Sequence, residues 1–165
     1  MNIYYDLEFI NIDGNEIHNT AIINDNVKLG RGNRIGAYCV IGSFGQMRGK
    51  EKYEGKVVIG DNNTIYEQCN IQTPVGQGEV TKIGNNNIIM SQSHIAHNAE
   101  IGNNTEIGNT VIIAGYAVIK DNTKIKMGSC IRNRITIEEN VIIGMGSVVV
   151  KNIKKGSVVW GNPAK

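Results

Sequence analysis

A six-residue hydrophobic repeat is the feature that most limits how this chain can fold. From Ile83 to Val149 an aliphatic residue stands at every sixth position without interruption. The same register continues toward the amino terminus through Ile71, Ile65 and Ile59, and again through Ile41, Ile35, Leu29, Ile23 and Ile17. A fixed period of this kind predicts a solenoid, in which each repeat packs mainly against its neighbours.

A second period of 18 residues is contained in the first. The hexapeptides IGNNNI at 83, IGNNTE at 101, IKDNTK at 119 and IEENVI at 137 resemble one another more than they resemble the hexapeptides between them. Three hexapeptides therefore make one turn, which predicts a triangular prism with a short strand on each of three faces and parallel pairing between coils. Asparagine tolerates left-handed backbone angles, so we expect a corner, with side-chain ladders, at the column Asn86, Asn104, Asn122 and Asn140.

Composition agrees with an all-β fold and excludes several classes of function. The 165 residues include 27 Ile but only 2 Leu, beside 20 Gly, which favours strands and turns over helices. A formal net charge of +2, from 17 basic and 15 acidic residues, gives no field that would attract a nucleic acid polymer. The cysteines Cys39, Cys69 and Cys130 form no CxxC pair, so we expect reduced core residues and no metal site.

The chain length predicts a single domain covering residues 1–165. We expect an amino-terminal cap over residues 1–16, a β-helix over residues 17–150 and a carboxyl-terminal tail over residues 151–165. Two polar, glycine-containing stretches near 44–56 and 74–82 break the repeat and should protrude as loops. Acidic residues replace the positive charge of a signal peptide and no apolar run could span a bilayer, so we expect a cytoplasmic protein.

The isoleucine-led hexapeptides resemble the left-handed parallel β-helix acyltransferases, and two parts of the chain resemble particular members. The middle, with the KYEG loop at 52, Glu67 and the HIAH segment at 94–97, is similar to the UDP-N-acetylglucosamine acyltransferases of lipid A synthesis. The tail, which ends in GNPAK, resembles the acetyl-CoA-dependent sugar acetyltransferases. The first resemblance implies a helical domain after the β-helix, and the chain has no room for one, so we expect a different enzyme.

The departures from the lipid A enzymes concern the site itself. Asn98 stands where the family has an Asp after its catalytic His, and Tyr116 stands where it has a His on the next coil. The family's His-Arg-Gly-Thr stretch is replaced by residues 72–75, so its acyl-chain and nucleotide contacts cannot be carried over from there.

Acyl transfer from a thioester needs a base, an oxyanion donor and a track for the carrier arm. The 18-residue period stacks His97, Gly115, Asn133 and Lys151 in one column. We predict that His97 is the general base and that the Gly115 N–H holds the oxyanion, as the resemblance also implies. His18 lies at the start of the solenoid, where we expect a solvated residue.

Acetyl-CoA is the expected donor, because the tail resembles that of the acetyltransferases. The residues expected to bind it are Gly115, Asn133, Lys151, Trp160 and Lys165. An equal alternative for Trp160 is to cover the apolar end of the last coil. The residues expected to bind the acceptor are Lys52, Tyr53, Glu67, Gln72 and His94.

The favoured function is acetyl-CoA-dependent O- or N-acetylation of a nucleotide-linked sugar used for surface polysaccharide, by a homotrimer without a metal. One alternative is a UDP-sugar acyltransferase that takes its acyl group from an acyl carrier protein. Another is the zinc carbonic anhydrase of the same fold, which binds metal through three His across a subunit boundary; bound zinc would distinguish it. A solenoid without catalysis is disfavoured by the HIAH segment.

Overall fold

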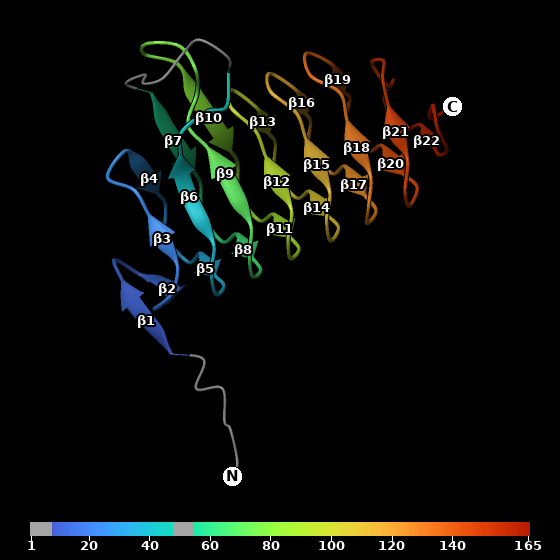
Figure 1. The fold of residues 1–165 in the computed structure, drawn as a ribbon. Coiled ribbons are helices and arrows are strands. Elements are labelled where there is room, and N and C mark those ends of the chain that lie inside the picture. Colours follow the sequence, from blue (N-terminus) through green and yellow to red (C-terminus); the bar gives the residue numbers. More distant parts are fainter. Residues whose placement is uncertain (1–7, 48–54) are drawn as a thin grey trace.

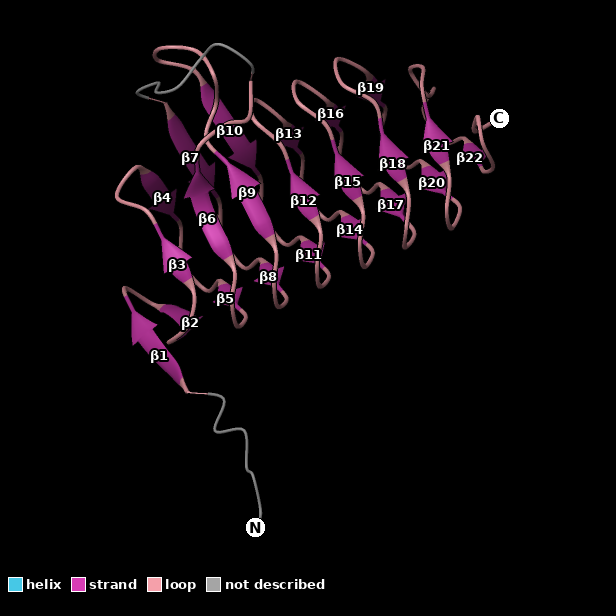
Figure 2. Cartoon of the chain, in the orientation of Figure 1, coloured by secondary structure: helices cyan, strands magenta, loops and turns pink. Residues whose placement is uncertain are grey.

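The computed structural model describes residues 8–47 and 55–165. Within these two ranges every regular element is a β-strand, and the strands lie in three sheets. Figure 1 shows the chain winding along one axis from β1 to β22, with each coil beside the next, and Figure 2 shows short strands joined by tight turns. We name the nine-stranded, seven-stranded and six-stranded sheets A, B and C.

The bounds of the strands follow the sheet order. Sheet A consists of β1 (Phe9–Ile12), β2 (Asn15–His18), β5 (Arg34–Ile35), β8 (Thr64–Ile65), β11 (Ile88–Ile89), β14 (Glu106–Ile107), β17 (Lys124–Ile125), β20 (Ile142–Ile143) and β22 (Val158–Val159). Sheet B consists of β3 (Ile22–Ile23), β6 (Val40–Ser43), β9 (Asn70–Gln72), β12 (His94–Ile95), β15 (Ile112–Ile113), β18 (Cys130–Ile131) and β21 (Val148–Val149). Sheet C consists of β4 (Val27–Leu29), β7 (Lys56–Ile59), β10 (Val80–Ile83), β13 (Glu100–Ile101), β16 (Val118–Ile119) and β19 (Thr136–Ile137).

The strands pair coil on coil, as the repeat predicts. Each strand after β2 pairs in parallel with the strand of the same sheet on the next coil, so that Ile95 lies between Ile71 and Ile113. Coils with only hexapeptides advance by 18 residues, as from Ile95 to Ile113. The predicted parallel β-helix of hexapeptide repeats is therefore confirmed.

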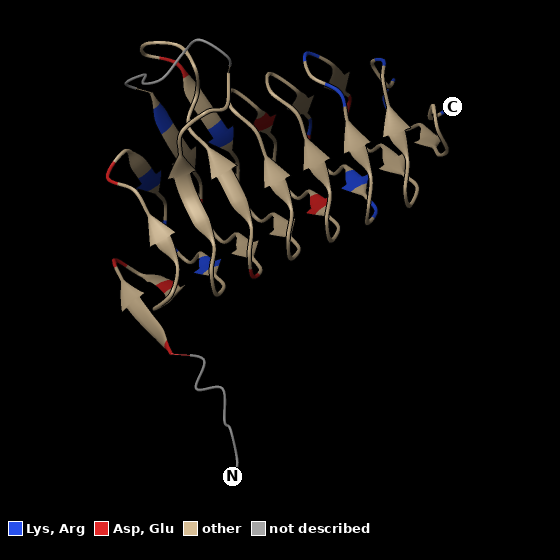
Figure 3. Cartoon of the chain, in the orientation of Figure 1, with Lys and Arg blue, Asp and Glu red and all other residues tan. Residues whose placement is uncertain are grey.

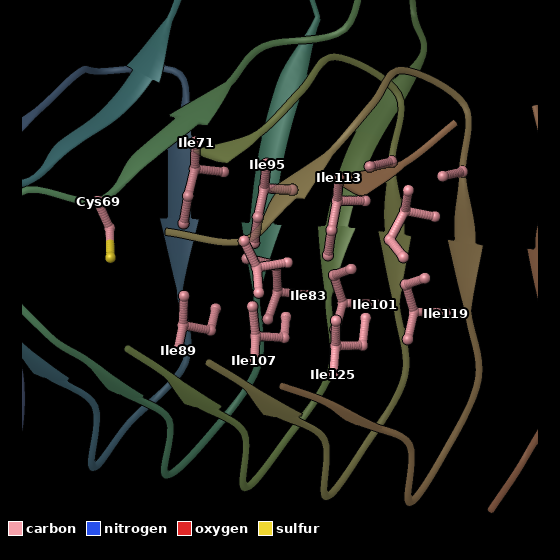
Figure 4. Close-up of a cluster of buried hydrophobic side chains, with 14 of the residues drawn as sticks. Cys69, Ile71, Ile83, Ile89, Ile95, Ile101, Ile107, Ile113, Ile119 and Ile125 are labelled. Carbon is pink, nitrogen blue, oxygen red and sulfur yellow. The ribbon is translucent and has the colours of Figure 1, made fainter. Parts of the chain in front are cut away.

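The interior of the prism is filled by the repeat isoleucines. Figure 4 shows them in stacks, one for each sheet, and those from Ile35 to Ile143 are at most 2% exposed. The position before each strand of sheet B holds a side chain smaller than isoleucine, as Cys39 and Cys69 do at 0% and 1% exposure. Cys130 is different: it lies on the outer face of β18 and is half-buried, so the expectation of a core residue is wrong for this cysteine.

The predicted asparagine column is a left-handed corner. Asn86, Asn104, Asn122 and Asn140 have φ between 54° and 58°. The side-chain ladders, however, run through the neighbouring positions. In one ladder, formed by Asn85, Asn103 and Asp121, each backbone N–H donates to the Oδ1 of the residue on the next coil at 2.7–2.8 Å. In a second, buried ladder each Oδ1 accepts the backbone N–H of the next residue at 2.8–2.9 Å; its members are Asn15, Asn33, Asn63, Asn87 and Thr105.

His18 is buried, with 6% of its surface exposed, so the expectation of a solvated residue is wrong. The reason is the amino-terminal hairpin, in which β1 pairs antiparallel with β2. The ring of Phe9 meets the His18 ring edge-on at a centroid distance of 5.4 Å. His18 Nδ1 lies 2.9 Å from Thr20 Oγ1 and accepts the Thr20 N–H, so this imidazole has a local structural role.

Residues 151–165 continue the winding. Ile153 bridges Ile137, and Val159 pairs with Ile143 on sheet A. Ala164 is 1% exposed and donates its N–H to the Val148 carbonyl at 2.9 Å. This segment buries apolar side chains against the last full coil.

Candidate active site

His97 lies at the corner where the chain passes from sheet B to sheet C. It follows β12, whose Ile95 is buried, and its own side chain is half-buried. Its carbonyl accepts the N–H of Tyr116 on the next coil at 3.1 Å. The parallel register therefore fixes the imidazole one coil before Gly115, as the 18-residue period predicts.

The imidazole lies directly over Gly115. A Cβ built on this glycine would lie 2.7 Å from His97 Nε2 and 2.9 Å from Nδ1, closer than side chains approach one another. Gly115 is therefore required for the ring to occupy this position, and it is buried beneath it. Among the described residues the Gly115 N–H has no hydrogen-bond acceptor, while the Gly115 carbonyl accepts from Arg134 N at 3.1 Å.

A chain of hydrogen bonds leads from the other side of the ring to a carboxylate. His97 Nδ1 lies 3.0 Å from Asn98 Oδ1, and Asn98 Nδ2 donates to Glu79 Oε2. Asn98 is 8% exposed and is held further by Val75 N–H at its Oδ1 and by Thr81 Oγ1 at its backbone N–H. Residues 72–82 thus supply the surroundings of His97 from the preceding coil.

Two further residues, Tyr116 and Gly45, pack against His97. Tyr116 meets it edge-on, with ring centroids 5.3 Å apart at 84°, and the Arg134 guanidinium carbon lies 4.2 Å from the Tyr116 ring centroid. From the other side, a Cβ on Gly45 would lie 2.9 Å from His97 Cβ, so the backbone after β6 passes against the histidine. Tyr116, which stands where the resemblance implies a histidine, packs against the His97 ring.

The rest of the predicted column follows the same corner. Asn133 and Lys151 are exposed on the two coils after Gly115. Trp160 is 65% exposed, at the carboxyl-terminal end of the prism. Trp160 and Lys165 are joined by reciprocal backbone hydrogen bonds of 3.3 and 3.1 Å.

The predicted acceptor residues divide into separate groups. His94 projects from the outer face of β12, between Asn70 and Ile112 of the adjacent strands. Gln72 ends β9, one coil before the site; its side chain is 1% exposed and its Oε1 has no partner among the described residues. Glu67 lies at another corner, between sheets A and B, and Lys52 and Tyr53 lie outside the described residues.

Two of these groups have shifted pKa values. Burial lowers the pKa of His94, and the nearby charge of His97 lowers it further. The imidazole of His94 is therefore kept neutral. The Ser91 hydroxyl, which donates to Glu67 Oε2 at 2.8 Å, lowers the pKa of Glu67.

Sequence reasoning missed Glu79 and the hydrogen bond that joins it to Asn98. Glu79 belongs to a loop that breaks the repeat, so no period relates it to His97. The only signal in the sequence was its distance of 19 residues from Asn98, which is close to one coil. Among residues 8–47 and 55–165 no group of three or more His, Cys, Asp or Glu side chains is arranged to hold a metal ion. The described part of the chain also contains no helix of the length and apolarity needed to cross a membrane.

Comparison with known proteins gives the family. The sequence profile of the bacterial transferase hexapeptide family (six repeats) matches residues 81–115 and 116–151. The chain is 44% identical over 81 residues to an acyl-[acyl-carrier-protein]–UDP-N-acetylglucosamine O-acyltransferase of Gloeothece citriformis, covering 47% of this chain and 28% of that protein. It is 39% identical over 175 aligned positions to the enzyme of that name from Psychrobacter sp., covering 91% of this chain and 68% of the relative.

Two solved structures that resemble this chain are, like its sequence relatives, named UDP-N-acetylglucosamine acyltransferases. The UDP-N-acetylglucosamine acyltransferase of Bacteroides fragilis superposes with a TM-score of 0.89 at 32% identity, covering 92% of this chain and 60% of that one. The Arabidopsis enzyme superposes with a TM-score of 0.77 at 26% identity, covering 93% and 72%. This chain therefore spans 28% to 72% of the length of these four proteins.

The expectation of acetyl-CoA as donor is wrong. It rested on the GNPAK ending, and the relatives are named for an acyl-[acyl-carrier-protein] donor. The structure gives this ending another reason: Ala164 is buried against the last coil, and the neighbouring backbone closes on Trp160. The sequence of the tail thus reflects closure of the prism. The chain belongs to the hexapeptide-repeat acyltransferases of the left-handed parallel β-helix fold, the family of the UDP-N-acetylglucosamine O-acyltransferases.

Proposed function

We propose that this protein transfers an acyl group from an acyl carrier protein to a hydroxyl group of a UDP-linked N-acetylamino sugar, with His97 as the general base. The observation that carries the proposal is the position of His97 Nε2 over Gly115, with Nδ1 hydrogen-bonded to Asn98. The names of the relatives support the donor and the acceptor.

The reaction is an acyl transfer with one proton moved twice. His97 Nε2 takes the proton of the sugar hydroxyl while the hydroxyl oxygen attacks the carbonyl carbon of the thioester. The carbonyl oxygen becomes an oxyanion that accepts the free Gly115 N–H, a donor fixed before the reaction begins. When the C–S bond breaks, the imidazolium returns the proton to the leaving thiolate, and the ester and free thiol are released.

The carrier arm would follow the corner column. Adjacent coils are about 4.8 Å apart, so Gly115, Asn133 and Lys151 form a row about 10 Å long, along which part of a phosphopantetheine arm could lie. Lys151 is an exposed cation at the far end, suited to the phosphodiester of that arm. Trp160 and Lys165 close the same end of the prism and extend this surface.

The acceptor would lie on the side of the preceding coil. Gln72, at the end of β9, is proposed to lie beside the sugar; because its side chain is 1% exposed, a direct hydrogen bond requires it to turn outward. His94, held neutral, can hydrogen-bond the same ligand without adding charge beside the base. Lys52 and Tyr53 are proposed to contact the nucleotide phosphates, and Glu67 to contribute from a neighbouring subunit.

We also propose a homotrimer that packs through sheet B. None of the seven strands of this sheet contains Lys, Arg, Asp or Glu, and Figure 3 shows them without charged residues while strands of the other two sheets carry both signs. The outward side chains are Ile22, Val40, Asn70, His94, Ile112, Cys130 and Val148. Such a face suits contact with a second copy, and it carries His94 into the interface.

The test is acyl transfer with defined substrates. Purified protein is incubated with UDP-N-acetylglucosamine and acyl carrier protein loaded with chains of different lengths, and product is measured by mass spectrometry. We expect product with wild type, a loss of turnover of about 10²- to 10⁴-fold in His97→Ala, and a raised acceptor KM in His94→Ala. Full turnover by His97→Ala, or transfer from acetyl-CoA but from no acyl carrier protein, would overturn the proposal.

A further inference from the structure

Asn98 is a nearly buried amide whose orientation is fixed from two sides. Its Oδ1 accepts the Val75 N–H at 3.0 Å, and its Nδ2 donates to the Glu79 carboxylate. A flipped amide would set N–H against N–H at Val75 and oxygen against oxygen at Glu79. Both contacts would be repulsive, so only one orientation satisfies the buried group.

The fixed amide determines which nitrogen of His97 carries the proton. Asn98 Oδ1 faces His97 Nδ1 at 3.0 Å, and an oxygen acceptor requires a donor opposite it. The neutral ring therefore has its proton on Nδ1, which leaves a lone pair on Nε2, beside Gly115. This is the tautomer that a general base at Nε2 must have.

Glu79 is itself held in position. Its backbone N–H donates to the Gly76 carbonyl, and its carbonyl accepts from Lys56 N, both at 3.3 Å. The carboxylate packs against the Cα of Gly76, where a Cβ would meet its oxygens. The loop between β9 and β10 thus folds back to set one carboxylate against the amide of Asn98.

We propose that Glu79 is a positioning residue that acts through Asn98 to hold the reactive tautomer of His97 and to stabilise the imidazolium formed during turnover. The inference rests on the proposed function for its catalytic consequence. An amide alone cannot balance the charge of an imidazolium, and the Glu79 carboxylate supplies a negative charge through the polarised amide. A carboxylate that the family pattern puts directly after the histidine is, in this chain, supplied from the preceding coil.

The test moves the carboxylate from position 79 to position 98 and the amide from position 98 to position 79. Glu79→Gln keeps a hydrogen-bond acceptor for Asn98 but removes the charge, and we expect kcat to fall about 10- to 100-fold with KM for both substrates within about twofold. Asn98→Asp together with Glu79→Gln puts the carboxylate directly on His97, with the new side-chain amide at position 79 as its donor. This double variant should recover kcat to within about fivefold of wild type, whereas Asn98→Asp alone sets two carboxylates together and should not.

A second measurement does not depend on turnover. Nitrogen-15 spectra of the histidines in the full chain should show His97 protonated at Nδ1 in wild type and in Glu79→Gln. In Glu79→Ala, where Asn98 loses its acceptor, the ratio of tautomers should shift by about fivefold toward Nε2–H. Glu100→Gln, an exposed carboxylate change on β13, is the matched control and should alter neither readout.

The two proposals fail separately. If no acyl donor gives product with wild type, the proposed function is wrong, and the tautomer spectra still decide the role of Glu79. The positioning role is overturned if wild-type His97 carries its proton on Nε2. It is equally overturned if Glu79→Gln retains full kcat, or if the double variant is no faster than Glu79→Gln alone.

Discussion

His94 and His97 belong to one short segment but face different surroundings. His97 has a hydrogen-bonding partner in Asn98 and an aromatic partner in Tyr116, whereas His94 lies between side chains of the adjacent strands on the face of sheet B. Burial and the charge of His97 both disfavour a proton on His94. The two imidazoles therefore differ both in their contacts and, for His94, in a lowered tendency to bind a proton.

The lowered pKa of His94 predicts a pH dependence of stability. The folded state resists protonation at this site, so below the unfolded pKa of 6.5 the unfolded chain binds more protons. The free energy of unfolding should therefore fall as pH decreases from 6.5 toward the lowered pKa of the folded state. His94→Gln should reduce this slope in denaturant unfolding at a series of pH values, and an unchanged slope would contradict the prediction.

Gly115 provides a second prediction at the residue scale. Alanine here would set a Cβ 2.7 Å from His97 Nε2, so the imidazole must rotate away from the site. We expect Gly115→Ala to lose at least about 100-fold in kcat, since both the base and the oxyanion donor are disturbed. Circular dichroism and a thermal unfolding scan serve as controls for the fold. A variant with wild-type kcat would show that the contact has no catalytic importance.

At the scale of residues, contacts could be predicted from the sequence only where the 18-residue period applies. The HIAH resemblance singled out His97, and the 18-residue spacing predicted its contact with Gly115, which the structure confirms. At Asn98 the sequence shows only that the family's carboxylate is absent. The carboxylate of Glu79, which accepts from Asn98, could not be predicted, because it belongs to a loop that no repeat positions. His18 was misjudged for a related reason: the strand that covers it lies outside the hexapeptide register and pairs antiparallel.

At the scale of elements, the asparagine ladders are side-chain hydrogen bonds that join one coil to the next. The left-handed residue of each turn, such as Asn86, is exposed, while Asn87 beside it is fully buried. The backbone reversal turns the following side chain inward, where it can satisfy the N–H groups of the next coil. The sequence predicted the corner, but a choice between adjacent asparagines needs the direction of each side chain.

Removing one ladder residue should therefore destabilise the prism. Asn63 accepts from Asn87 N at 2.9 Å, donates to the Gly84 carbonyl at 2.9 Å and donates to Asn33 Oδ1 at 2.9 Å. Each buried group left without a partner costs about 1–3 kcal/mol, so we expect Asn63→Ala to lower the free energy of unfolding by more than about 2 kcal/mol. Asn133→Ala, at an exposed site, should change it by less than about 0.5 kcal/mol. Equal effects in urea unfolding would show that the ladder adds no stability.

At the scale of the whole molecule, the three faces of the prism differ although their interiors are alike. The inward isoleucines stack identically under sheets A, B and C, so the core sets no preference among faces. Only the outward positions distinguish them, and those of sheet B are uncharged along its full length. The repeat predicted the prism, whereas the choice of a contact face follows from the side chains between the repeat positions.

Two isoleucines on different faces allow a matched test of the proposed trimer. Ile112 on β15 of sheet B is 46% exposed, and Ile88 on β11 of sheet A is 42% exposed; both are the first residue of a two-residue strand. A lysine at Ile112 would bury a charge in the proposed interface, whereas a lysine at Ile88 would stay in solvent beside the charged residues of sheet A. We expect wild type and Ile88→Lys to have three times the 18.0 kDa chain mass by light scattering, and Ile112→Lys to approach the monomer mass. A monomeric wild type, or equal dissociation of both variants, would contradict the assignment of sheet B.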